Sequence, residues 1–265
     1  MSKIKKSLLL FTILCFALSS IFYYLIIAKN MLDASTLLMW CPGVAAIIVK
    51  MVYHRGENVL MIRKVKVKYI LYAILLPLIY WGISYSIYVL IYGKSVLGEN
   101  MLLRLLKEPQ LLIVLLLTYL FTGLGEEIGW RGYLMPKMDE LFGFRKGTAI
   151  CGIIWFLWHL PVFLAGYVST IPLWYQLPTL FILIIALAYP MADVTLRSRS
   201  VWPAAVLHGT HNMVSQLLLD QSIGGEMRPF LVGETGIISV AVLAVVAWII
   251  SKNYLKIEGL APQKN

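Results

Sequence analysis

Two acids and a base lie inside an apolar stretch of this chain, in the segment Glu126–Arg131. A charged side chain inside hydrocarbon costs about 2.5 to 3.5 kcal/mol on insertion scales, so such groups usually have polar partners and a function. On an α-helix, residues four apart share a face, so Glu127 and Arg131 can pair while Glu126 points about 100 degrees away. Glu126 then has no partner close in sequence, and we expect it to find one on another helix.

Three of the four histidines also lie inside apolar stretches. His159 follows Trp155 by one helical turn, so the indole can shield it from lipid. His208 and Asn212 project together from one helix face, and His211 is turned by about 60 degrees to the other side of His208. Taken singly, each of these histidines could equally form a hydrogen bond that joins two membrane helices and have no catalytic role.

The depth of these side chains favours a shared site. At about 1.5 Å of rise per residue, Glu126, His159 and His208 lie roughly 8, 16 and 10 Å from the cytoplasmic ends of their helices. Glutamate, histidine and asparagine suit hydrolysis, because a carboxylate can take a proton from water while His and Asn donors stabilise an oxyanion. The structural alternative is that Glu126, Glu127 and Arg131 end the fourth apolar segment and snorkel to water.

Two other chemistries fit the same residues less well. Cys151 lies two turns before His159 but about 80 degrees round the helix, and it has no charged neighbour that would favour a thiolate. Zinc ligation by Glu126, His159 and His208 is chemically reasonable, but the chain has no HExxH motif, and its three cysteines lack CxxC spacing. We therefore expect neither a metal nor another cofactor.

The composition indicates an all-α, polytopic membrane protein. Of 265 residues, 60% are hydrophobic and only 14% are charged, and the mean hydropathy is +0.81, which is far from a soluble domain. The net charge of +10 could suggest nucleic acid, but the basic residues gather between apolar runs and near the termini, where they act as topology signals. We expect contact with membrane lipid and no nucleic-acid partner.

About eight transmembrane helices can be drawn in the sequence. They cover residues 7–28, 34–53, 69–92, 110–131, 148–167, 172–192, 201–219 and 235–251. The first follows Lys3, Lys5 and Lys6, as in a signal peptide, but it is long enough to span and lacks a clear cleavage site, so we expect it to be retained.

Lysine and arginine are concentrated in alternate connections, at 55–68, 137–146 and 197–199. The outer loop at 94–108 carries charges of both signs and is expected to form an interfacial helix. The positive-inside rule then places both termini in the cytoplasm of a multi-pass cell-membrane protein. No internal repeat divides the chain, so we expect residues 1–265 to form a single helical membrane domain, with 110–219 as its catalytic core.

Three motifs occur in order on the fourth, fifth and seventh predicted helices: Glu126-Glu127-x-x-x-Arg131, Trp155-x-x-x-His159 and His208-x-x-x-Asn212. Together they resemble the CPBP (Abi) family of intramembrane endopeptidases, which includes the CAAX prenyl proteases and proteins linked to bacteriocin processing or self-immunity. The motifs cover about 90 residues, and the first three predicted helices show only compatible hydropathy. The family's second motif often begins with Phe, where this chain has Trp.

The resemblance implies a glutamate-dependent endopeptidase with a conical intramembrane cavity and a peptide or lipid-modified protein as its substrate. Glu126 would activate water together with His159, and His208 with Asn212 would form the oxyanion site. The other motif residues would support the site: Glu127, Arg131 and Trp155. Several members are described as metal-dependent, an assignment that the glutamate mechanism disputes.

A non-catalytic membrane protein is the rival hypothesis. It would be either a bacteriocin-type immunity factor or a transporter that relays protons through Glu126 and the histidines. Discontinuous helices and paired inverted halves favour transport, and the sequence shows no such halves. An immunity factor would not have to use the same residues. Undiminished protection against the bacteriocin by a Glu126→Gln variant would therefore indicate a role without proteolysis.

Overall fold

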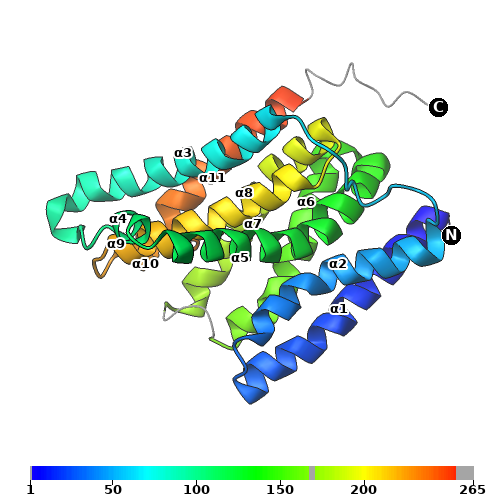
Figure 1. Cartoon of the computed structure of the whole chain (residues 1–265), viewed down its shortest axis with the longest axis horizontal. Helices are drawn as coiled ribbons and strands as arrows, with labels where there is room; N and C mark the ends of the chain where they lie inside the picture. Colours follow the sequence, from blue (N-terminus) through cyan, green and yellow to red (C-terminus); the bar gives the residue numbers. More distant parts are fainter. Residues whose placement is uncertain (1, 167–170, 255–265) are drawn as a thin grey trace.

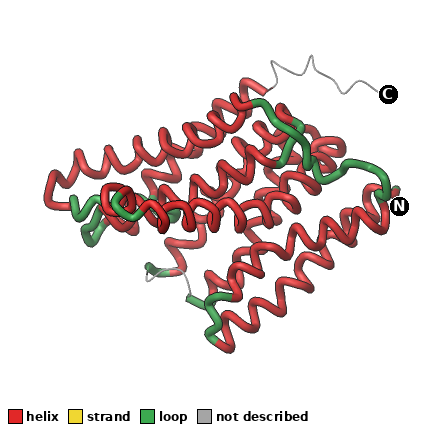
Figure 2. The backbone as a smooth tube through the Cα atoms, in the orientation of Figure 1, coloured by secondary structure: helices red, strands yellow, loops and turns green. Residues whose placement is uncertain are grey.

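The computed structural model describes residues 2–166 and 171–254, and within these ranges the chain forms a bundle of long helices without a named strand (Figures 1 and 2). The predicted all-α, polytopic fold is confirmed. The long helices are α1 (Lys3–Lys29), α2 (Ala34–Tyr53), α3 (Val67–Tyr92), α5 (Pro109–Glu127), α6 (Met135–Leu164), α7 (Leu173–Ser198), α8 (Trp202–Asn212) and α11 (Ile237–Tyr254). Such elements suit a bilayer because each helix satisfies its own backbone hydrogen bonds.

Shorter helical elements connect the long ones on one side of the bundle. They are η1 (Gly93–Val96), α4 (Met101–Leu106), α9 (Asp220–Ser222) and α10 (Arg228–Leu231). Helix α4 lies in the loop for which the sequence predicts an interfacial helix, and the Asn100 side chain caps it by accepting a hydrogen bond from the Leu103 amide at 3.0 Å.

Six helical segments of the described chain are long and apolar enough to cross a membrane. One of them, Pro109–Leu164, has 56 residues, which as one helix would measure about 84 Å, far more than the roughly 30 Å hydrocarbon core. The chain turns within it at Gly143, where φ is 73° and ψ is 164°. This segment contains the fourth predicted helix and residues 148–164 of the fifth, whose last residue, 167, lies outside the described residues. The total of eight crossings stays a prediction.

Helix α5 does not end at the charged motif. A π-helical segment, η2 (Ile128–Leu134), continues it directly into the first half of α6. The fourth helix was predicted to end at residue 131, and this boundary is wrong, because the helix runs on to the turn at Gly143. A second π-helical segment, η3 (Met213–Leu219), continues α8 past Asn212. Such segments occur often at functional sites.

The packing places the three motif helices at the centre. Helix α5 lies against α8 and α2, α6 lies against α7, and α8 also contacts α3 and α7. Helices α1 and α2 form a hairpin along one edge of the bundle (Figure 1). The motifs on α5–η2, α6 and α8 therefore come from neighbouring elements although they are distant in sequence.

Backbone-to-backbone contact fixes α2 against the charged motif. A Cβ atom added to Gly129 would lie 2.5 Å from the carbonyl carbon of Pro42, and one added to Gly43 would lie 2.5 Å from the carbonyl oxygen of Gly125. Membrane helices use small residues in this way, since close approach replaces the hydrophobic driving force.

We predict that Gly129→Ala lowers the free energy of unfolding by about 1 to 3 kcal/mol, because the added methyl group overpacks this contact. Thermal unfolding of the purified protein in detergent measures the change. Gly82→Ala is the matched control, since nothing lies within 4 Å of a Cβ atom at that position of α3. Equal Tm values for the two variants would contradict the prediction.

Candidate active site

A cavity of about 430 Å³ opens between the helices that carry the three motifs. Glu126, His159, His208 and Asn212, from α5, α6 and α8, all line it. Apolar side chains of α2, α6 and α7 form much of the remaining wall. The volume lies in the range of small-molecule and cofactor sites, and a few polar groups in an apolar wall are typical of such sites.

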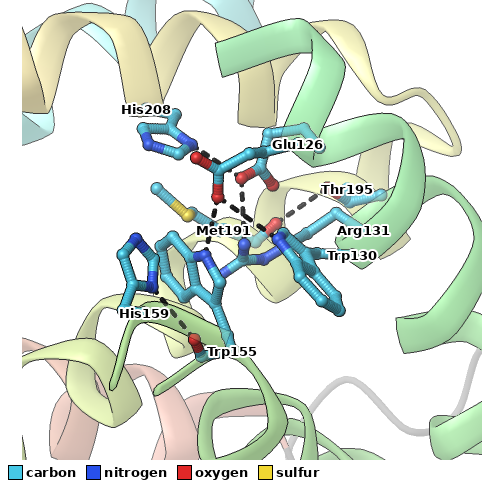
Figure 3. A network of polar contacts seen from close by, with 9 residues as sticks. Glu126, Trp130, Arg131, Trp155, His159, Met191, Thr195 and His208 are labelled. Carbon is cyan, nitrogen blue, oxygen red and sulfur yellow. Dashed lines mark hydrogen bonds and ion pairs between the residues drawn. The ribbon is translucent and has the colours of Figure 1, made fainter. Parts of the chain in front are cut away.

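Glu126 is fixed by two indole groups. Its Oε2 atom accepts hydrogen bonds from Trp155 Nε1 at 2.7 Å and from Trp130 Nε1 at 3.2 Å (Figure 3). Trp130 lies one turn further along the same helix, whereas Trp155 comes from α6. The partner that the sequence led us to expect on another helix is thus a tryptophan. Within the described residues, no hydrogen bond reaches the other oxygen, Oε1.

Glu127 joins the first and third motifs. Its Oε1 atom accepts from Arg131 Nη1 at 2.9 Å and from His208 Nδ1 at 2.8 Å. The pairing of Glu127 with Arg131 was expected from their spacing, but the contact with His208 was not. The other oxygen, Oε2, is buried without a hydrogen-bond partner among the described residues.

The snorkelling alternative is wrong for these charged side chains. Glu126, Glu127 and Arg131 are 1%, 0% and 2% exposed. They lie inside a continuous helical segment rather than at its end, so they have protein partners instead of bulk water.

His159 has a defined hydrogen-bonding arrangement. Its Nδ1 atom lies 2.9 Å from the backbone oxygen of Trp155. A carbonyl oxygen only accepts, so this contact assigns the proton to Nδ1 and leaves the lone pair of a neutral ring on Nε2. The ring packs edge-on against Trp158, with centroids 4.8 Å apart, and against Trp155, with centroids 5.5 Å apart.

Trp155 contacts residues of all three motifs. Besides its hydrogen bond to Glu126, its ring lies 5.5 Å from that of His208 and 4.0 Å from the guanidinium carbon of Arg131. The sequence led us to expect a shield for His159, and the ring does pack there. The donor role was missed, and a phenylalanine at this position would lack it.

Other residues at the site belong to no predicted motif. Trp130 was missed as a donor, although its spacing of four residues from Glu126 was a usable signal. His211, Gln216 and Glu234 line the cavity. Nothing in the spacing of the motifs points to Glu234, because it lies in the loop between α10 and α11.

The donor set does not favour zinc. Within residues 2–166 and 171–254, no group of three His, Cys, Asp or Glu side chains is arranged to hold a metal ion. Glu126 Oε2 already accepts from two indoles, and His208 Nδ1 already binds Glu127. A zinc ion would therefore have to bind the other carboxylate oxygen of Glu126 and the other ring nitrogen of His208.

We predict that Glu127→Gln lowers the free energy of unfolding by about 3 to 5 kcal/mol, because Arg131 would stay buried without a counter-charge. Denaturant unfolding measures the change. Glu57→Gln is the control, since Glu57 forms a half-exposed ion pair with Lys3 and such pairs contribute little. Unfolding midpoints that fall equally in both variants would contradict a structural role for the buried pair.

Comparison with known proteins supports the resemblance read from the motifs. Residues 108–214 match the family model described as type II CAAX prenyl endopeptidase Rce1-like. A curated relative, CAAX prenyl protease 2 of Methanococcus maripaludis, is 28% identical over 99 residues, which are 35% of this chain and 36% of the relative. The match thus spans about a third of the relative's length. With the ordered motifs and the membrane helices, these findings support the similarity of this part of the chain to the CPBP/CAAX protease family.

Proposed function

We propose that the protein is an intramembrane endopeptidase that hydrolyses a peptide bond with water activated by Glu126. One observation carries this proposal: a buried carboxylate, fixed by two indole donors, shares a cavity with His159, His208 and Asn212. The match to the Rce1-like family model supports a peptidase, and the site supplies the groups that hydrolysis needs.

Glu126 is the general base. Trp130 and Trp155 bind Oε2, which fixes the carboxylate and leaves Oε1 for a water molecule. Oε1 takes one proton as the water oxygen bonds to the scissile carbonyl carbon. When the tetrahedral intermediate collapses, the C–N bond breaks, and the same proton passes from Glu126 to the leaving nitrogen. The carboxylate is then regenerated.

His159 orients the water. Because the hydrogen bond to Trp155 O assigns the proton to Nδ1, Nε2 is an acceptor. A water that donates one hydrogen to Glu126 and the other to His159 Nε2 has its oxygen lone pairs free for attack. Orientation of this kind supplies part of the rate enhancement, since it fixes the attacking atom before reaction.

His208 and Asn212 stabilise the oxyanion. His208 Nδ1 donates a hydrogen bond to Glu127. Its other ring nitrogen, Nε2, can donate to an oxyanion only when the imidazole carries a proton on both nitrogens. Glu127 is the counter-charge for this imidazolium form. The amide nitrogen of Asn212 is the second donor. Preorganised donors act strongly where water is excluded. Arg131 binds Glu127 and so positions His208 through it.

The substrate is a peptide or a lipid-modified protein that reaches the cavity near the cytoplasmic leaflet. The apolar wall suits residues or a lipid chain that leave water. In this proposal both termini lie in the cytoplasm, residues 110–219 form the catalytic core, and the reaction uses no metal or other cofactor.

We predict that Glu126→Gln lowers kcat by at least about 100-fold, the lower end of the general-base contribution, while the Tm is retained. Mass spectrometry of peptide products from purified protein in lipid nanodiscs measures this. His159→Ala and His208→Ala are expected to behave alike. The control is Glu140→Gln, an exposed acid on α6 outside the cavity. Unchanged turnover by Glu126→Gln would defeat the mechanism.

We further predict that Trp155→Phe lowers kcat by about 10- to 100-fold with a smaller effect on KM. The substitution keeps an aromatic ring but removes a hydrogen bond to a charged group, worth about 1.5 to 3 kcal/mol. Steady-state kinetics on the same peptides test it. Trp174→Phe is the matched control, because Trp174 is 76% exposed on α7. If both variants retain wild-type kcat, the indole donor has no part in catalysis.

A further inference from the structure

The cavity has a second carboxylate that no motif contains. Glu234 lines it together with His211 of α8 and Gln216 of η3. Glu234 lies in the loop between α10 and α11, beyond residue 214, where the family match ends. Its side chain is 24% exposed, so a molecule in the cavity can reach it.

A chain of contacts fixes this carboxylate. Gln216 Nε2 donates to Glu234 Oε1 at 2.8 Å, and His211 Nε2 lies 3.8 Å from the same oxygen. His211 is itself held by α3, through a contact of 2.5 Å between its Nδ1 and the Tyr80 hydroxyl and through the Trp81 indole, which donates to its backbone oxygen at 3.1 Å. Within the described residues, no hydrogen bond reaches Glu234 Oε2.

Carboxylates line the cavity, but no lysine or arginine is among the described residues that line it. The carboxylates are those of Glu126 and Glu234. Arg131 binds Glu127 instead, and Arg228, in the same connection as Glu234, binds Asp220. Burial raises the pKa of Glu234, and the hydrogen bond from Gln216 opposes this rise. A ligand cation would supply the counter-charge that the protein does not.

We propose that Glu234 determines specificity by binding a lysine or arginine side chain of the substrate near the scissile bond. This inference rests on the proposed function and names the substrate class of the same site. The aliphatic stem of such a side chain packs along the apolar wall while its charged end reaches Glu234. An acidic side chain in the same place meets the Glu234 carboxylate and is disfavoured.

Two sets of measurements test the inference. Both use fluorescent peptides that differ only at one position, which is occupied by lysine, norleucine or glutamate, and this position is moved along the central segment of the peptide. The first is peptide binding to the Glu126→Gln variant in neutral nanodiscs, by fluorescence anisotropy. We expect lysine at one position to tighten binding about tenfold over norleucine. In the double variant Glu126→Gln/Glu234→Gln, the tighter binding of the lysine peptide disappears. In Glu126→Gln/Glu234→Arg, the peptide with glutamate at that position binds most tightly.

The control is Glu126→Gln/Glu226→Gln, since Glu226 is exposed in the preceding loop, between α9 and α10, and does not line the cavity. It should keep the preference for lysine. A lysine advantage at no position, or one that survives Glu234→Gln, overturns the inference. Thermal unfolding identifies any variant that fails to fold, and Glu234→Asp then replaces it, with a weakened preference expected.

Cleavage by the wild-type protein separates this inference from the proposed function. If norleucine and lysine peptides are cleaved with equal kcat/KM, Glu234 does not set specificity although the enzyme is a peptidase. If lysine peptides bind tightly through Glu234 but none is cleaved, the ligand class stands and the peptidase proposal fails.

Discussion

A carboxylate inside an apolar bundle needs hydrogen-bond donors, because water is scarce there and an unpaired buried charge is costly. For Glu126 these donors are two indole N–H groups, which satisfy one oxygen without neutralising the charge. A lysine or arginine in their place would have formed an ion pair. The tryptophans instead bind a buried carboxylate through neutral donors, and the hydrogen bond from Trp155 joins α6 to the end of α5.

The neighbouring acid has the opposite environment. Glu127 contacts a guanidinium and an imidazole through one oxygen, and this contact joins α8 to the segment that follows α5. Two adjacent residues of the same type therefore have different partners. The Glu126 carboxylate accepts from neutral indoles, and the Glu127 carboxylate binds a guanidinium and holds a histidine in place. The difference comes from which face of the helix each side chain occupies and what packs against that face.

The sequence indicated which residues line one cavity better than it indicated their contacts. Helical spacing alone indicated that Glu127 and Arg131 pair, because that contact is local. The bond between His208 and Glu127 joins residues 81 apart, and no spacing rule reports on such pairs. The indole of Trp155 was judged by its bulk rather than by its N–H, and Glu234 was missed because it stands alone in a loop. The end of the fourth helix was misplaced because charged residues usually mark a membrane surface, whereas here their partners lie inside the protein.

The π-helical segments η2 and η3 have a further consequence for the geometry of the bundle. A π turn holds one more residue than the α turn it replaces, so it rotates the following side chains by about 100 degrees relative to a regular helix. A helical wheel drawn straight through residues 128–134 therefore assigns the wrong orientation to everything after it. Removing one amino acid from that stretch would restore a regular α turn and leave the start of α6 facing its present neighbours. Removing one from the α-helical turns on either side would instead rotate α6 by about 100 degrees, so the π segment is where this helix best tolerates a change in length.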